Sequence, residues 1–128
     1  MPLVGPARAA AAGVLSLRIA YGAVLLAAPT KLAGKRWLGP GAGAAAARVP
    51  LRGVGGREIA VHGAGLATLL RGGDARPWLA VSIAGDLADV SATAASRNDL
   101  PDGSTAATVI VAGGSALLSA IIALLLDD

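Results

Sequence analysis

Ionisable side chains interrupt three apolar stretches of this sequence, and their spacing places several of them on common helix faces. Ser82, Asp86, Asp89 and Thr93 follow one another at intervals of four, three and four residues, which is the spacing of one helix face. Two carboxyl groups one turn apart ionise together only at a cost, so one of them is expected to hold a proton beside an ionised neighbour. Such a pair offers an acid and a base side by side, and it predicts acid–base chemistry.

A second apolar stretch carries Glu58 and His62 four residues apart, so the carboxylate can hydrogen-bond the imidazole and orient it as a proton relay. Arg18, on the first stretch, and Arg57, beside Glu58, are candidates for stabilising negative charge. Tyr21, about one turn beyond Arg18, can add a phenol to the same site. We therefore predict catalytic roles for Asp86, Asp89, Glu58 and His62, and substrate-binding roles for Arg18, Arg57, Tyr21, Ser82 and Thr93.

The same residues also allow a purely structural explanation, which stays open at this point. Arg18 can pair with Asp86 or Asp89 and lock two helices together, since buried ion pairs often specify packing more than they stabilise it. Arg57 can extend its charged end towards a membrane surface along its apolar stem. His62 is the only histidine, and a single histidine is more often a hydrogen-bonded packing residue than a catalyst.

Other kinds of site are disfavoured by residue type. The chain has no Cys, which excludes disulfides, thiolate metal sites and cysteine nucleophiles. Glu58, His62, Asp86 and Asp89 are hard ligands, but their spacing matches no metal signature, so we expect neither a metal nor a cofactor. The aromatic residues are few, so the net charge of +3 is weak support for nucleic-acid binding and none is expected.

The composition identifies the elements that must position these residues. The chain is 55% hydrophobic and only 15% charged, whereas a soluble domain carries about 25% charged residues. A helix needs about 20 mostly apolar residues to cross a bilayer. Four stretches qualify, and they predict an all-α, four-helix transmembrane bundle, one domain over residues 1–128, in a multi-pass protein of the cell membrane. The expected spans are residues 9–28, 53–70, 77–96 and 105–126.

Charged side chains inside such spans should turn towards one another. A charge at the middle of a bilayer costs about 2.5–3.5 kcal/mol on insertion scales, so it faces the bundle interior or a water-filled cavity. We expect a polar pocket between the first three helices, with the uncharged fourth helix as an apolar wall. The charges of the spans nearly balance, with two cations against three carboxylates: Arg18 and Arg57 against Glu58, Asp86 and Asp89.

The connections suggest an orientation in the membrane. Residues 31–52 form a Gly- and Ala-rich basic loop. We expect the first span to be a membrane helix rather than a cleaved signal peptide, because Arg18 interrupts its apolar stretch. The first and third connections hold six basic residues, whereas the N-terminal segment and the second connection hold three. Because Lys and Arg are enriched in cytoplasmic loops, this difference favours termini outside the cytoplasm. The six are Lys31, Lys35, Arg36, Arg48, Arg52 and Arg97, and the three are Arg8, Arg71 and Arg76.

Short sequence patterns in the second and third spans resemble a known group of proteins. The patterns REIAVHG at residues 57–63, RPW at 76–78 and GDLAD at 85–89 are similar to those of small four-helix membrane proteins common in high-GC actinobacteria. The resemblance implies the four-helix topology and no activity. Small multidrug exporters are comparable in length, but they place a glutamate in the first helix where this chain has Arg18, which argues against a cation exporter.

The leading functional hypothesis is a membrane-embedded acid–base enzyme that acts on a lipophilic substrate. Isomerisation, cyclisation and hydrolytic ring opening each need a carboxylic acid, a base and a shielded apolar cavity. A proton-coupled carrier and a non-enzymatic accessory subunit of a membrane complex remain alternatives. Small residues on one face of the fourth span, Thr108, Ala112, Ala116 and Ala120, allow close packing within the bundle, with a second copy or with a larger membrane partner.

Overall fold

The computed structural model describes residues 5–34 and 37–126, and these residues are helical with no strand among them. The all-helical prediction is therefore confirmed. Four long helical segments carry the fold: α1 (Pro6–Ala27), α3 (Ala45–Leu70), α4 (Arg76–Ala95), and a continuous segment made of α5 (Ser104–Thr108), the π-helical η3 (Val109–Gly113) and α6 (Gly114–Leu125). The connections hold α2 (Pro29–Ala33), η1 (Gly39–Gly43) and η2 (Arg97–Asp99).

The four long segments lie close to the four expected spans, with one difference. α3 begins at Ala45 rather than at residue 53, so part of the expected basic loop is helical. Pro50 lies inside this added part, in its second turn, where the helix lacks the hydrogen bond that a backbone N–H would donate to the carbonyl of residue 46. Lys35 and Arg36, two of the expected loop cations, lie outside the described residues.

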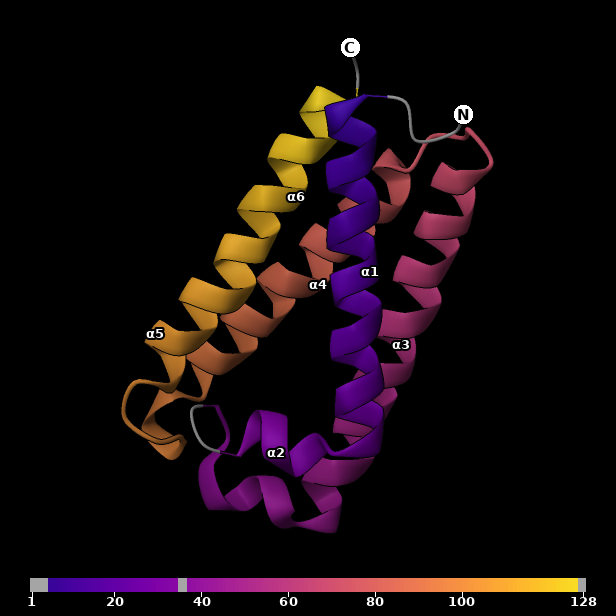
Figure 1. Cartoon of the computed structure of the whole chain (residues 1–128). Coiled ribbons are helices and arrows are strands. Elements are labelled where there is room, and N and C mark those ends of the chain that lie inside the picture. Colours follow the sequence, from indigo (N-terminus) through magenta and orange to yellow (C-terminus); the bar gives the residue numbers. More distant parts are fainter. Residues whose placement is uncertain (1–4, 35–36, 127–128) are drawn as a thin grey trace.

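The helices form two pairs that diverge towards one end of the molecule (Figure 1). α1 packs antiparallel to α3, and α4 packs against the α5–η3–α6 segment. The start of α1 and the end of α6 lie at the end where the pairs meet, and α2 lies at the opposite end. η1 contacts both α2 and α3 at that end.

Glycines bring α1 and α3 together. A Cβ added at Gly55 would lie 2.7 Å from the carbonyl oxygen of Gly22 and 2.8 Å from the backbone nitrogen of Leu26. A Cβ at Gly22 would likewise lie 2.7 Å from the carbonyl oxygen of Gly55. Small residues at a crossing let two backbones approach, as is common between membrane helices. The close approach of α1 and α3 therefore depends on the absence of a side chain at both positions.

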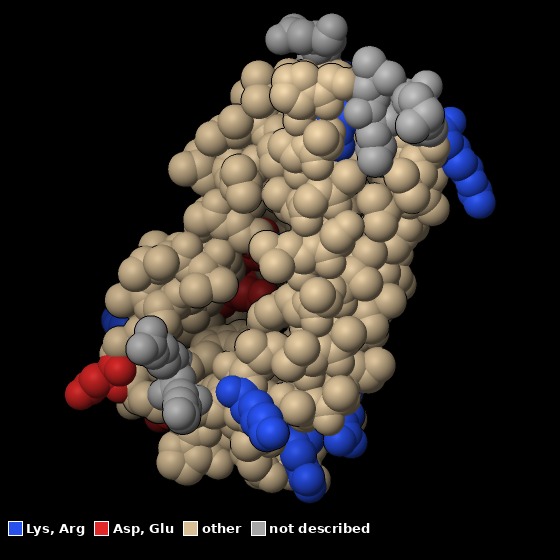
Figure 2. Space-filling model, viewed as in Figure 1, with Lys and Arg blue, Asp and Glu red and all other residues tan. Residues whose placement is uncertain are grey.

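The distribution of polar and apolar side chains is inverted relative to a water-soluble protein. Buried side chains include His62, Ser82, Asp86 and Ser119, all at most 4% exposed. Within residues 5–34 and 37–126, sixteen large hydrophobic side chains are exposed, among them Ile110 at 73%. Basic side chains gather at the two ends of the molecule, and the band between them is free of charge on the visible face, except for carboxylates inside a hollow (Figure 2). Such an outer surface matches a lipid environment better than water.

Two helical segments meet the length and hydropathy expected of a membrane span. They are Pro6–Ala27 and Ser104–Leu125, each of 22 residues, and only 22% and 28% of their most apolar windows are buried. α3 and α4 fall short of the same criterion among the described residues. Membrane association is thus supported by two helices, and spanning by all four is a proposal taken up below.

The turn between α3 and α4 is closed by an exposed ion pair with a measurable pH signature. The Arg76 side chain donates to both carboxyl oxygens of Asp74 at 2.8 Å, and its backbone N–H donates at 3.0 Å. These hydrogen bonds lower the pKa of Asp74 from 3.8 to about 2, and those from the Arg76 side chain have the largest effect. Because the folded-state pKa is the lower one, the stabilising effect is present above about pH 4 and is lost as the pH falls towards 2.

We expect an NMR titration of the Asp74 carboxyl carbon to show a midpoint near 2, and Arg76→Gln to move it up towards 3.8. The backbone N–H remains in that variant, so the return should be partial. A wild-type midpoint at 3.8 would contradict the ion pair.

Candidate functional site

A buried network of ion pairs joins the two helix pairs at their middle. The Arg18 guanidinium, on α1, donates to both carboxyl oxygens of Glu58 on α3, from Nε at 2.7 Å and from Nη2 at 2.9 Å. Its Nη1 donates to Asp86 on α4, with an Nη1–Oδ1 distance of 2.8 Å. The same nitrogen donates to the Ser115 hydroxyl on α6. One guanidinium thus connects four helices through charge-assisted hydrogen bonds.

His62 extends this network towards α4 and is fully hydrogen-bonded. Its Nδ1 lies 2.7 Å from the carbonyl oxygen of Glu58, which can only accept, so Nδ1 carries a hydrogen. Its Nε2 lies 2.8 Å from the Ser82 hydroxyl, which can donate to it. The ring is therefore satisfied in its neutral form. With 1% exposure, His62 has no free nitrogen for a ligand and fits the structural explanation.

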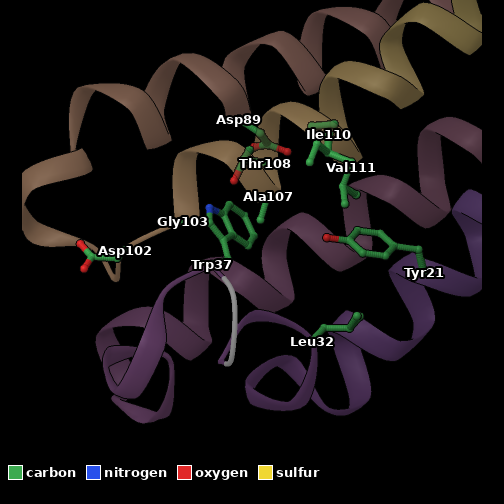
Figure 3. A pocket seen from close by; sticks show the side chains of 11 residues that line it. Tyr21, Leu32, Trp37, Asp89, Asp102, Gly103, Ala107, Thr108, Ile110 and Val111 are labelled. Carbon is green, nitrogen blue, oxygen red and sulfur yellow. The ribbon is translucent and has the colours of Figure 1, made fainter.

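A cavity of about 630 Å³ opens beside the network, at the α2 end. Figure 2 shows its mouth as a hollow with carboxylates inside, and Figure 3 shows the side chains that line it. α1 contributes Tyr21, α4 contributes Asp89, and α3 contributes none of the lining residues. Among the described residues, the lining consists of Tyr21, Leu32, Trp37, Asp89, Asp102, Gly103, Ala107, Thr108, Ile110, Val111 and Ala112. A volume of this size is typical of small-molecule sites.

Trp37 is fixed in the cavity wall by hydrogen bonds to residues of α4 and α5. Its indole Nε1–H donates to the Thr93 hydroxyl of α4 at 2.9 Å. Its backbone carbonyl accepts a hydrogen bond of 2.7 Å from the Ser104 hydroxyl at the start of α5. The indole N–H and the backbone carbonyl of Trp37 are therefore occupied, and the ring forms part of the cavity wall (Figure 3).

The π-helical segment η3 supplies the apolar part of the wall. Ile110, Val111 and Ala112 lie within it, and Thr108 immediately precedes it. The Thr108 hydroxyl donates to the Ser104 carbonyl at 2.8 Å, so its oxygen can only accept a hydrogen bond from a ligand. π-Helical turns within longer helices are rare and are frequently found at functional sites.

Asp89 differs from the other carboxylates of the interior. Glu58 and Asp86 are paired with Arg18, whereas Asp89 makes no hydrogen bond or ion pair with another residue in the described part of the chain. Its side chain faces the cavity together with Tyr21 (Figure 3). Of the three carboxyl groups of Glu58, Asp86 and Asp89, that of Asp89 is therefore the one that a ligand in the cavity could reach.

The predicted site residues thus lie in the buried network, in or beside the cavity, or, for one of them, outside both. Arg18, Glu58, His62, Ser82 and Asp86 form the buried network, and the structure brings them together as the spacing suggested. Tyr21 and Asp89 line the cavity, and Thr93 holds Trp37 in its wall. Arg57 is exposed and donates weakly to the Gly53 carbonyl of its own helix, 3.4 Å away, so it belongs to neither place.

Two contributors were not among the predicted site residues. The spacing of the sequence does not single out Trp37, whose position in the wall depends on a long-range hydrogen bond to Thr93. Ser115 lies in the uncharged fourth span, and it joins the Arg18 network. A serine in an otherwise apolar span was the available signal. No group of three or more metal-ligating side chains occurs within residues 5–34 and 37–126.

Comparison of the chain with protein-family models, with curated proteins and with solved structures finds no match.

Proposed function

We propose that the protein is a multi-pass membrane protein whose four long helical segments all cross the bilayer. α4 has 20 residues, a length of about 30 Å at 1.5 Å per residue, which is the thickness of a bilayer core. Its charged side chains Asp86 and Asp89 face the network and the cavity, while Val81 and Leu87 are exposed on its outer surface. The low hydropathy of α4 is then a consequence of its inward-facing charges, whereas α3 also carries the exposed Arg57, whose charged end can extend along its apolar stem towards the membrane surface.

The cavity is proposed to bind a lipophilic small molecule on which the protein performs acid–base chemistry. The observation that carries this proposal is Asp89, an interior carboxyl group that faces the cavity without a partner among the described residues. An unpaired carboxyl group in an apolar setting is costly to maintain, and such groups in membrane helices usually serve function. Isomerisation, cyclisation and ring opening of a lipophilic substrate are the reaction classes that suit this arrangement.

Each part of the site has a distinct role in this proposal. Asp89 gives or takes the proton, and the Tyr21 phenol is the second group able to exchange a hydrogen bond with the substrate. Glu58, His62 and Asp86 are positioning residues, since Arg18 and Ser82 occupy their polar atoms. The apolar wall of η3 excludes water from the reacting atoms.

Dicyclohexylcarbodiimide tests the role of Asp89, because this apolar reagent adds to a carboxylic acid that can take up a proton inside a membrane. We expect peptide mass spectrometry to find the acylurea adduct on Asp89 and not on Glu58 or Asp86, which are held as ion pairs with Arg18. Labelling should be faster at lower pH. Equal labelling of all three carboxyl groups, or none at Asp89, would contradict the proposal.

Turnover is tested with the purified protein and a lipid extract of its native cells, followed by mass spectrometry. We expect Asp89→Asn to slow the conversion of any substrate about a hundredfold, the usual effect of a lost general acid or base. Asp74→Asn, at the opposite end of the molecule, is the matched control and should leave the rate unchanged. A folded Asp89→Asn variant with wild-type turnover would overturn the catalytic assignment.

The opening of the cavity at the molecular surface also supports a proton-coupled carrier as a second candidate. A carrier would show uptake into liposomes driven by a pH gradient, and Asp89→Asn would abolish it. Uptake without chemical change of the transported molecule would decide for the carrier, and product formation in detergent would decide for the enzyme.

A further inference from the structure

The charged groups that the structure describes in the cavity wall are all of one sign. Among the eleven described lining residues, Asp89 and Asp102 are acidic and none is basic. Arg18 lies nearby, but its donors are directed to Glu58, Asp86 and Ser115. The described residues of the cavity therefore offer a ligand negative charge and no compensating cation.

The position of Arg57 extends this imbalance to the whole interior. The sequence predicts two cations against three carboxylates in the spans, but the structure places Arg57 on the outer surface. Within the described part of the bundle one guanidinium, from Arg18, then faces three carboxylates, those of Glu58, Asp86 and Asp89. An apolar interior disfavours an excess of one charge sign, so it favours either a proton or a cation beside Asp89.

The aromatic side chains of the cavity favour a cation, rather than a proton, beside Asp89. The Trp37 indole has its N–H bound to Thr93, so the ring is held in place in the cavity wall. Tyr21 contributes a second ring across the cavity (Figure 3). Aromatic faces attract cations, tryptophan most strongly, and the attraction increases when water is excluded.

We propose that the molecule bound in this cavity is a lipophilic organic cation, such as a hydrophobic amine in its ammonium form. Its positive centre pairs with the Asp89 carboxylate and lies against the rings of Trp37 and Tyr21. Its apolar part packs against Ile110 and Val111 of η3. The assignment rests on the proposed function, in that it names the class of molecule for the same cavity.

Tetraphenylphosphonium and tetraphenylborate provide the test, since the two ions are nearly identical in shape and opposite in charge. Binding is measured by equilibrium dialysis against the full-length protein in detergent. We expect the phosphonium ion to bind at least tenfold more tightly than the borate. Asp89→Asn should weaken phosphonium binding about tenfold or more, and Trp37→Leu about threefold or more. Asp74→Asn should bind as the wild type does.

The location of the probe is read from tryptophan fluorescence. The chain has two tryptophans, so Trp78→Phe leaves Trp37 as its sole indole. Trp78 lies away from the cavity, where it donates to Thr68 near the end of α3. Phosphonium should change the fluorescence of that variant, and Asp89→Asn in the same background should suppress the change.

Three outcomes overturn the inference: equal affinity for the two ions, preference for the borate, or phosphonium binding that Asp89→Asn leaves intact. If one of them occurs while the carbodiimide still labels Asp89 and turnover still depends on it, the proposed function stands and only the ligand class falls. If Asp89 is neither labelled nor required for turnover, the proposed function falls by itself.

Discussion

Replacing Arg18 with methionine is expected to prevent the protein from reaching its folded state. The substitution leaves Glu58 and Asp86 as neighbouring carboxylates without a cation, and Asp86 is only 2% exposed. Removing one partner of a buried ion pair typically costs about 3–5 kcal/mol. That cost is comparable with the whole stability of a small domain, about 5–15 kcal/mol. Fluorescence-detected size-exclusion chromatography of the detergent-solubilised variant should show aggregated or absent protein.

Two control variants separate charge from geometry. Arg18→Lys keeps the positive charge but loses the paired hydrogen bonds to Glu58, so it should fold with reduced thermal stability. The triple variant Arg18→Met, Glu58→Gln, Asp86→Asn removes the charges together and should recover folding in part. A monodisperse Arg18→Met protein with wild-type thermal stability would show that the network does not hold the helices together.

The second large effect is expected at the crossing of α1 and α3. Leucine in place of Gly55 would put a side chain where the Gly22 carbonyl oxygen and the Leu26 nitrogen already lie within 2.8 Å of the Cβ position. Backbone atoms cannot move aside as a flexible side chain can, so the helices must separate. Overpacking costs about 1–3 kcal/mol, and a clash with backbone belongs at the upper end of that range or beyond it. Separation would also pull Arg18 away from Glu58.

Gly56→Leu is the matched control for this effect. Gly56 is the next residue along α3, and nothing lies within 4 Å of a Cβ placed there. Leucine is a better helix former than glycine by nearly 1 kcal/mol, so this variant should be at least as stable as the wild type. The comparison is made by the thermal unfolding midpoint in detergent. Equal midpoints for the two leucine variants would contradict the close helix contact.

The helices themselves were largely predictable from sequence. Apolar stretches bounded by proline and glycine predicted three of the four segments to within three residues, because helix length and hydrophobicity are local properties. The early start of α3 was not predicted, since a Gly- and Ala-rich segment with Pro50 carries little helical signal of its own. Its helix is supported by packing of Leu51 with Leu25, Ala33 and Ala42.

The inward position of the polar residues was also predictable. Which of them join the ion network and which line the cavity was not. Helical spacing placed Asp86 and Asp89 on one face, and lipid outside the helix implied that this face turns inward. Three residues make a rotation of about 300°, so the two side chains diverge by about 60°. That divergence sends Asp86 to Arg18 and Asp89 to the cavity, an outcome that depends on where α1 lies. Helix placement is a tertiary property that periodicity alone does not contain.

The π-helical segment η3 has a consequence for how this chain can tolerate insertions and deletions. A π turn accommodates one residue more than an α turn, so losing one residue between Val109 and Gly113 would leave a regular α-helix that could still cross a bilayer. The two halves of the segment would keep nearly the same rotation relative to each other, because the π turn already takes up that residue within about one turn. Ser115 would stay beside Arg18, whereas the cavity wall would lose one residue of η3, and the hydropathy of the segment would stay almost the same. The additional residue of the π turn therefore belongs to the cavity wall, and its loss would reshape the cavity while the ion network stayed in place.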